Sequence, residues 1–259
     1  MSERETSAVS IRDLGFSYEK GRDVLSGINL DIRRGERFGI IGPSGAGKST
    51  LLLHLNGILR GQSGSVEIGN IAVKDETLSS IRQKVGLVFQ NPDDQLFNPT
   101  VEEDVAFGPL NMGLRGEDSA MRVREALRDM NLEGFEKHSP HHLSYGERKR
   151  VALATVLSMR PEIVAFDEPF SNLNPAMVEQ LIGIVKGLDA TVIIVSQSII
   201  PVLAACERVA VLNEGAIAAV GPVSEIAAER ELLRECGLDF HFYCEICRGL
   251  SEMNGANDV

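Results

Sequence analysis

Residues 42–49 read GPSGAGKS and constrain the fold of this 259-residue chain more than any other feature. They match the pattern G-x-x-x-x-G-K-[S/T], in which glycines let backbone N–H groups turn inward around phosphate oxygens. The apolar run RFGIIG (37–42) precedes the segment, and STLLLHLNGIL (49–59), which is helical in period, follows it. A phosphate loop between a strand and a helix predicts a nucleotide-binding α/β domain. The alternative is a glycine-rich strand-to-helix turn that binds nothing.

Two side chains of this loop are expected to bind the phosphates and the metal ion. Lys48 would reach the β- and γ-phosphates of a nucleotide, and Ser49 would ligate Mg²⁺. A second stretch, IVAFDEP (163–169), reads as an apolar strand that carries Asp167 to the edge of a sheet. There Asp167 could hold Mg²⁺ through water, and Glu168 could orient or deprotonate the attacking water. Taken alone, this acidic pair could equally cap a helix ahead of Pro169.

Composition restricts the class of protein. The chain is 43% hydrophobic and 24% charged, as in an ordinary soluble globular protein. Its formal net charge of -11 argues against nucleic acid as the main partner. The N-terminal MSERETSAVS is polar and has no signal-peptide core, and no apolar run approaches the roughly 20 residues of a spanning helix. We therefore expect a cytosolic protein.

The order of predicted elements indicates an α/β fold. Strand patterns occupy residues 8–35, 64–73, 84–90 and 191–196, and 208–222 reads as a hairpin that turns at 213–215. Helical patterns occupy residues 118–132, 148–159 and 175–188. Strands that alternate with helices predict a largely parallel sheet. The mostly helical stretch at about 91–160 would be inserted between two strands of that sheet.

The sequence LSYGERKRVALA (143–154) resembles the signature motif of ABC ATPases, L-S-G-G-Q followed by a basic helix. Leu143, Ser144 and Gly146 match this motif, whereas Tyr145 and Glu147 depart from it. The resemblance covers about residues 9–222. It implies a P-loop NTPase core of RecA-like type with an antiparallel β subdomain and an inserted helical subdomain. On this basis, residues 1–222 form the ATPase domain, and 223–259 form a helical tail that could contact a second subunit.

A narrower resemblance is carried by VFQNPDDQLFNPTVEEDVAFGP (88–109), which is similar to the energy-coupling factor (ECF) subgroup. ATPases of that subgroup serve the uptake of vitamins and transition-metal ions. The resemblance implies a second ABC ATPase subunit, identical or different, together with a transmembrane coupling protein and a substrate-binding membrane component. It also implies a location at the cytoplasmic face of the membrane. No role in binding nucleic acid is implied.

The resemblance assigns roles to individual residues. Tyr18 would stack on the adenine, although a tyrosine on the face of a strand is the alternative. Gln90 would touch Mg²⁺ and the attacking water. Ser144 and Gly146, with Glu147 beside them, would face the γ-phosphate of ATP held by the opposite subunit. The residues implied to bind the phosphates of the chain's own ATP are Gly42, Pro43, Ser44, Gly45, Ala46, Gly47, Lys48, Ser49 and Thr50.

Two positions depart from the family pattern near the reaction centre. The strand TVIIVS (191–196) is followed by Gln197, where the family has a switch histidine. Glutamine can donate an amide hydrogen bond but cannot become cationic. Asn174 stands where the D-loop usually has aspartate, and it also suits an N-cap before Pro175. We therefore expect this subunit's own site to bind ATP normally and to hydrolyse it slowly.

Two weaker patterns could bind metal. Cys236, His241, Cys244 and Cys247 could hold Zn²⁺ tetrahedrally, although a reduced, packed C-terminal segment is the favoured interpretation. His138, His141 and His142 precede the signature, and there a solvated loop is favoured over a metal site.

Two other functions compete with an importer ATPase. One is a soluble ABC protein of DNA repair or translation, which usually has two cassettes or a long coiled-coil insertion. The other is a regulatory clamp that dimerises with ATP and barely turns over, which Gln197 would suit. Co-purification with a membrane protein separates transport from the first of these, and single-turnover hydrolysis separates it from the second.

Overall fold

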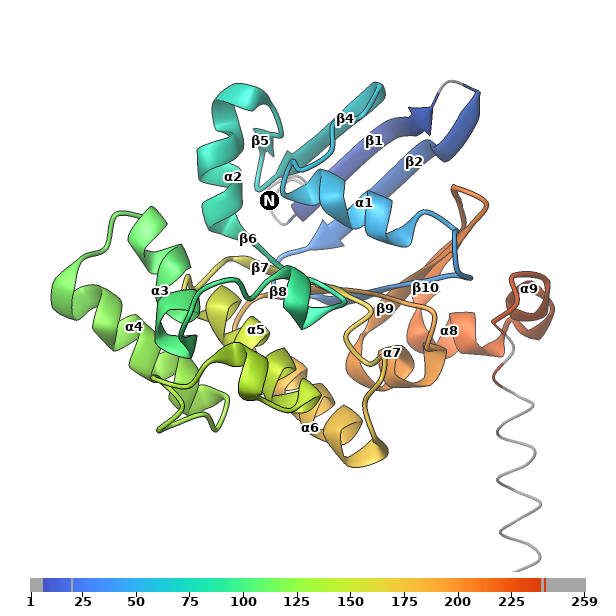
Figure 1. The fold of residues 1–259 in the computed structure, drawn as a ribbon. Coiled ribbons are helices and arrows are strands. Elements are labelled where there is room, and N and C mark those ends of the chain that lie inside the picture. The colour runs from blue at the N-terminus through green and yellow to red at the C-terminus, as the bar shows by residue number, and fades with distance from the viewer. Residues whose placement is uncertain (1–6, 20, 239, 241–259) are drawn as a thin grey trace, which may run out of the picture.

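The protein is described from a computed structural model that places residues 7–19, 21–238 and 240. It contains two sheets with helices packed around them (Figure 1). The smaller sheet is antiparallel, with strand order β2-β1-β4-β5. Its strands are β1 (Ser7–Glu19), β2 (Arg22–Arg33), β4 (Ser63–Ile68) and β5 (Ile71–Ala72).

The larger sheet has the strand order β10-β9-β3-β8-β7-β6 and is parallel except at β10. Its strands are β3 (Arg37–Ile41), β6 (Val85–Val88), β7 (Ile163–Asp167), β8 (Thr191–Ser196), β9 (Arg208–Asn213) and β10 (Ala216–Pro222). All six residues of β8 are buried, as expected of a central parallel strand with both faces covered. The carboxyl ends of β3, β7 and β8 meet at one edge, which is where sites form in such sheets.

The residues of β8 alternate between two hydrophobic cores. Val192 and Ile194 contribute to the core below the large sheet, whereas Ile193 and Val195 contribute to the core between the two sheets. This alternation follows from the two-residue period of a strand. Helix α1 (Lys48–Leu55) lies in the core between the two sheets (Figure 1).

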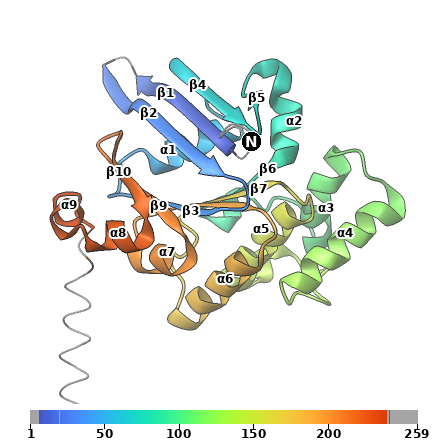
Figure 2. The same ribbon diagram turned by 180° about the vertical axis from the view of Figure 1, so that it is seen from behind.

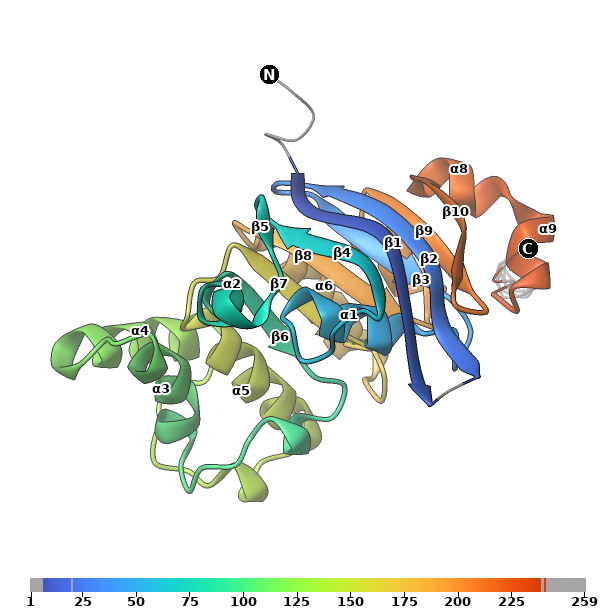
Figure 3. The same ribbon diagram turned by 90° about the horizontal axis from the view of Figure 1, so that it is seen from above.

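Helices cover the remaining surfaces of the large sheet. Figure 2 shows α6 (Pro175–Gly187) and α7 (Ile199–Ala205) below it. A group of three helices extends from one side of the molecule (Figure 3): α3 (Val101–Asn111), α4 (Gly116–Asp129) and α5 (Tyr145–Leu157). The others are α2 (Leu78–Lys84), α8 (Val223–Ala228) and α9 (Arg230–Glu235). None of the helices in the described ranges has the length and apolar character needed to span a bilayer.

The predicted α/β arrangement of an antiparallel and a largely parallel sheet is confirmed. Element boundaries differ in places. Helix α1 ends at Leu55 rather than near residue 59, because Asn56 caps it and Gly57 takes the left-handed conformation, with φ of 68°. Helix α5 begins three residues before the predicted 148. Two short helices, α2 and α7, were not predicted from the sequence.

Candidate nucleotide site

The phosphate loop connects the end of β3 to the start of α1 (Figure 1). Gly45 and Gly47 have φ of 81° and 100°, values that side chains rarely tolerate. Gly42 is required for a different reason, because a Cβ at this position would lie 2.2 Å from the carbonyl oxygen of Leu212 on β9. Each of these glycines therefore permits a backbone path that another residue would obstruct.

Lys48 lies within this loop with its side chain only 6% exposed. Its ammonium donates hydrogen bonds to the carbonyl oxygens of Gly42 and Pro43, at 2.9 Å and 3.0 Å. The same nitrogen lies 3.5 Å from Oε1 of Glu168. The loop thus holds a buried positive charge beside the end of β7, where an anionic phosphate would be stabilised.

Ser49 and Asp167 form the pair expected to hold a metal ion. The Ser49 hydroxyl donates to Oδ1 of Asp167 at 2.9 Å. Burial raises the pKa of Asp167; the hydrogen bond from Ser49 opposes this shift and the charge of Glu168 adds to it. Gln90 lines the same cleft as Ser49. This set of hydroxyl, carboxylate and amide oxygens fits Mg²⁺, which prefers oxygen ligands.

Glu168 is held in place by several contacts. Its φ is 45°, in the left-handed region, and its N–H donates to the carbonyl oxygen of Val195 on β8 at 2.9 Å. The hydroxyl of Ser196 donates to Oε2 at 2.8 Å. The backbone N–H of Gln197 donates to Oε1 and Oε2 at 2.8 Å and 3.1 Å. The side chain is buried, so these contacts fix the carboxylate beside Lys48.

One cleft brings most of the predicted catalytic residues together. It contains the loop lysine, the glutamate at the end of β7, and the glutamines that follow β6 and β8. The lining residues are Val24, Ser44, Gly45, Gly47, Lys48, Ser49, Thr50, Gln90, Glu168 and Gln197. Side chains from β2, α1 and three strand ends thus converge on one space.

Tyr18 lies near this cleft with 60% of its surface exposed. Its hydroxyl is 3.2 Å from the hydroxyl of Thr50, at the start of α1. The ring of Phe16 packs edge-on against it, with centroids 4.9 Å apart. The aromatic ring is therefore anchored to the phosphate-loop helix and still presents surface on which a base could stack.

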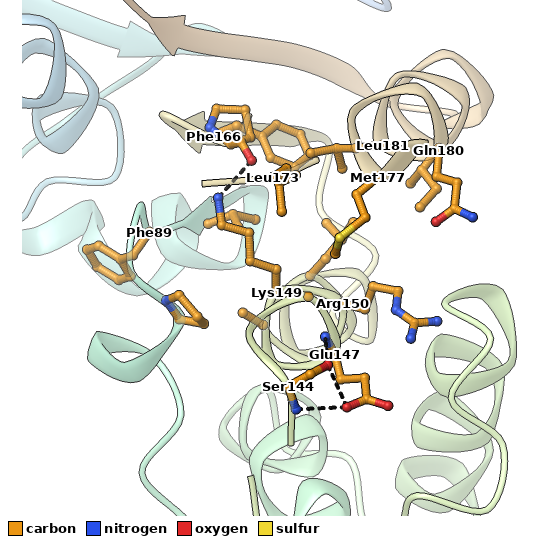
Figure 4. Close-up of a pocket in the computed structure, with 17 residues that line it drawn as sticks. Phe89, Ser144, Glu147, Lys149, Arg150, Phe166, Leu173, Met177, Gln180 and Leu181 are labelled. Atoms are coloured by element: carbon orange, nitrogen blue, oxygen red, sulfur yellow. Dashed lines mark hydrogen bonds between the residues drawn. The ribbon is translucent and has the colours of Figure 1, made fainter. Parts of the chain in front are cut away.

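The signature residues do not line the cleft that contains Lys48. Ser144, Gly146 and Glu147 line a second cleft, of about 350 Å³, between α5, α6 and the end of β6 (Figure 4). Among the described residues, none is shared between the linings of the two clefts. The chain therefore does not bring its own signature onto its own Lys48.

Ser144 is the N-cap of α5 and forms a capping box with Glu147. Oε2 of Glu147 accepts from the Ser144 backbone N–H at 2.8 Å and from its hydroxyl at 2.7 Å. These hydrogen bonds hold the pKa of Glu147 below its ordinary value. The carboxylate thus occupies the donors that the sequence assigns to a phosphate.

Gly146 and Asn174 have local structural roles as well. A Cβ on Gly146 would lie 1.8 Å from Cε of Met177 on α6, so the glycine permits close contact between α5 and α6. Oδ1 of Asn174 accepts from the N–H of Met177 at 3.0 Å, which makes Asn174 the N-cap of α6.

The sequence analysis missed two residues of this region. The hydroxyl of Ser196 donates a hydrogen bond to Glu168. The sequence signal for this role was a polar residue that follows five apolar or β-branched positions and directly precedes Gln197. Lys149 donates to the carbonyl oxygens of Pro169 and Ser171, immediately after Glu168. Its position three and four residues before the buried Ala152 and Leu153 could have placed it on the inner face of α5.

Of the two weaker metal patterns, only the three histidines before the signature lie entirely within the described residues. In that part of the chain, no group of three His, Cys, Asp or Glu side chains is arranged to hold a metal ion. The ring of His138 packs on Phe135, with centroids 5.1 Å apart. Cys236 is buried at the end of α9. His241, Cys244 and Cys247 lie outside the described residues.

Comparisons with known proteins show which family this chain resembles. A family model described as ABC transporter matches residues 25–171. The energy-coupling factor transporter ATP-binding protein EcfA of Methanothermobacter thermautotrophicus is 50% identical over 236 residues, which cover 89% of this chain and 76% of that protein. EcfA of Methanococcus maripaludis is 46% identical over 232 residues, covering 88% and 84%.

Solved structures give a similar result. CbiO1 from Clostridium perfringens, described as part of the ABC transporter complex CbiONQ, superimposes with a TM-score of 0.81 at 35% identity. That match covers 94% of this chain and all of the other. The ATP-binding cassette MJ0796, in a dimeric post-hydrolysis state bound to ADP and Pi, superimposes with a TM-score of 0.74 at 32% identity. It covers 83% of this chain and 98% of the cassette.

Proposed function

Since this chain belongs to the ABC transporter family of ATPases, we propose that it is the ATP-hydrolysing subunit of an ECF-type importer. The observation that carries the proposal is the convergence of Lys48, Glu168 and Gln197 on one cleft, with the signature Ser144 lining another. The relatives named EcfA, and the CbiO1 structure from an ABC transporter complex, support the choice of subgroup.

In the proposed mechanism, the first cleft binds ATP. Tyr18 stacks on the adenine, and the backbone of residues 42–50 surrounds the phosphates, with Lys48 against the β- and γ-phosphates. Ser49, Gln90 and Asp167 would hold Mg²⁺, which would neutralise charge on the phosphates. Glu168 acts as the base for water, since Ser196 and Gln197 hold its carboxylate beside Lys48.

The second half of the site comes from another subunit. Ser144 and Gly146 begin α5, a 13-residue helix whose first N–H groups favour an anion. We propose that they face the γ-phosphate of ATP bound to a partner chain, which is a second copy or a related subunit. Binding of ATP between two chains then closes the dimer, and hydrolysis with product release reopens it.

Exposed apolar side chains on α3 and in the loop before it form a surface suited to a membrane partner. Phe97 and Phe107 are 63% and 50% exposed, and their rings pack edge to face with centroids 5.0 Å apart. Leu110 on α3 is also exposed. This surface follows the loop after Gln90, so we propose that it docks the transmembrane coupling protein at the cytoplasmic face of the membrane. The cargo, a vitamin or a transition-metal ion, is then selected by a separate membrane component.

We further propose that the site turns over slowly. Gln197 stands at the switch position beside Glu168 and offers an amide where the family has an imidazole. Removal of one preorganised donor typically costs 10²–10³ in rate, and glutamine would recover part of this loss. The same observation favours a second candidate function, a regulatory dimer clamp that binds ATP and barely hydrolyses it.

Two measurements test this proposal. The first is ATP-dependent association of the purified chain, alone and with candidate partner subunits, in the presence of Mg²⁺ and with Glu168→Gln blocking hydrolysis. A chain that stays monomeric with every partner would contradict the two-subunit site.

The second measurement is co-purification with a membrane protein. We expect the wild type to retain the partner and Phe97→Ser/Phe107→Ser to lose it. Met121→Ser is a matched control, since Met121 on α4 is also exposed but lies outside this ring pair. Measurable steady-state hydrolysis in the complex would favour the importer over the clamp.

A further inference from the structure

Lys149 connects the signature helix to the loop that carries Glu168. It lies one turn after Ser144 on α5 and points inward, and Figure 4 shows its side chain reaching toward Phe166 and Leu173. Its ammonium donates to the carbonyl oxygen of Pro169 at 2.8 Å and to that of Ser171 at 3.1 Å.

The loop that Lys149 holds is a tight turn. Glu168 and Asn172, which bracket it, have φ of 45° and 59°, both in the left-handed region. The backbone N–H and the hydroxyl of Ser171 donate to the carbonyl oxygen of Glu168, at 3.2 Å and 2.8 Å. Because the turn folds back on Glu168, displacement of its Pro169 and Ser171 carbonyls would also displace the glutamate backbone.

The charge of Lys149 lies in an apolar environment. Phe166, Leu173 and Leu181 line the cleft around it, and the ring of Tyr145 on its own helix lies 5.5 Å from the ammonium. Burial lowers the pKa of Lys149 to about 8, and the charge of Glu168 partly opposes this shift. A buried cation needs hydrogen-bond acceptors, and the Pro169 and Ser171 carbonyl oxygens supply them, so the charge ties Lys149 to this loop.

A second contact joins the same two segments. Gly146, on the first turn of α5, packs against Met177 on α6 so closely that a side chain would not fit. Met177 in turn follows the loop and is tied to Asn174 by the N-cap hydrogen bond. The start of α5 therefore contacts residues 169–177 in two ways. The Lys149 ammonium bonds the loop carbonyls, and Gly146 packs against Met177.

We propose that Lys149 is a positioning residue that transmits the docking of the signature helix on a partner's nucleotide to the geometry of Glu168 in its own site. This inference rests on the proposed function. Movement of α5 toward a partner would pull on the Pro169 and Ser171 carbonyls through Lys149. Engagement of the signature would thus shift the backbone of Glu168 in the same subunit.

The test compares three variants in the assembly that hydrolyses ATP. Lys149→Met removes the donor and the charge while keeping an unbranched side chain. Lys149→Gln keeps an amide donor. Arg160→Met is the control for loss of a cation, because Arg160 pairs with Glu125 on α4 and lines neither cleft.

We expect Lys149→Met to lower kcat by about tenfold or more, because small displacements of a catalytic group have effects of this size. The KM for ATP should stay within about twofold, since Lys149 lines the signature cleft and not the Lys48 cleft. Lys149→Gln should recover part of kcat, and Arg160→Met should leave it unchanged. Amide hydrogen exchange at Ser171 should be faster in Lys149→Met alone.

Three results would overturn the inference: wild-type kcat in Lys149→Met, an equal loss of kcat in Arg160→Met, or a loss confined to KM. If Lys149→Met does not fold, Lys149→Gln carries the test: its kcat should lie below the wild-type value with KM unchanged, and a wild-type kcat overturns the inference. Failure of the proposed function is distinct, because the wild-type chain would then not associate in the presence of ATP or would not retain a membrane protein, whatever the Lys149 variants do.

Discussion

The backbone N–H of Gln197 donates hydrogen bonds to both carboxylate oxygens of Glu168, at 2.8 Å and 3.1 Å. Because the donor is the main chain, a substitution at position 197 leaves this contact available. The side chain of Gln197 is free to line the cleft with Lys48. Variants at this position therefore report on the switch side chain and not on the placement of the glutamate.

Replacement of Gln197 by histidine should raise steady-state ATP turnover in the assembled complex by about tenfold or more, since an imidazole restores the stronger donor. Gln197→Ala should lower turnover below the wild-type value. Nucleotide affinity should change little in either variant. Equal or lower turnover in Gln197→His would contradict the interpretation of a slowed site.

Ser196→Ala removes the hydroxyl that donates to Oε2 of Glu168 at 2.8 Å and accepts from the N–H of Ser198 at 3.0 Å. Hydrogen bonds to charged groups are worth about 1.5–3 kcal/mol, so we expect kcat to fall by about tenfold or more. The KM for ATP should be nearly unchanged.

Ser158→Ala is the matched control for Ser196→Ala. Ser158 is also buried, and its hydroxyl donates to the carbonyl oxygens of Val105 and Thr155, away from the cleft. Comparable losses of kcat in both variants would indicate a general loss of packing and not a role for Ser196 at Glu168.

Glu147→Gln should strengthen ATP-driven association of two chains. The Glu147 carboxylate bonds the Ser144 N–H and hydroxyl, which the proposal assigns to a partner's phosphate. A neutral amide would compete less well, because charge-assisted hydrogen bonds are roughly twice as strong as neutral ones. We expect association measured by sedimentation, with hydrolysis blocked, to tighten by about threefold or more.

Glu103→Gln provides the control, since Glu103 forms the same capping box with Thr100 at the start of α3. This variant should leave association unchanged. Weaker association of Glu147→Gln would mean that the carboxylate assists contact between the subunits.

Lys149 should give the stability of the folded chain a pH dependence. Burial lowers its pKa from the ordinary 10.5 to about 8, so between these values the unfolded chain binds a proton that the folded chain lacks. The free energy of unfolding should therefore rise as pH increases through this window, with a slope approaching one proton per molecule. Below about pH 8 both states hold the proton, and the Lys149 contribution becomes constant.

Urea unfolding at several pH values tests this linkage. The wild type minus Lys149→Met difference isolates the lysine from other groups that titrate at high pH. A difference that does not vary with pH would show that the ammonium is not desolvated in the folded chain.

Much of the fold follows from local sequence pattern. Buried runs such as TVIIVS predict central strands, and their two-residue period agrees with the division of β8 between two cores. The short helices α2 and α7 have only seven residues each, too few to establish a helical period. Tertiary packing decides such segments, so the sequence alone did not predict them.

In the candidate site too, some residues could be predicted from the sequence and others could not. The loop at Lys48 is recognisable because its glycines and lysine are adjacent in sequence. The contacts of Glu168 with Ser196 and of Lys149 with Pro169 join residues that are distant in sequence or lie on different elements. Their partners depend on strand order and helix placement, which no local pattern specifies.

Among the described residues, none lines both the cleft at Lys48 and the cleft at Ser144. Under the proposed mechanism, an isolated subunit therefore hydrolyses no ATP. In dilute solution, the rate of ATP hydrolysis per chain should rise with protein concentration, because more chains are then paired. Copies of this chain that remain unpaired would therefore consume no ATP.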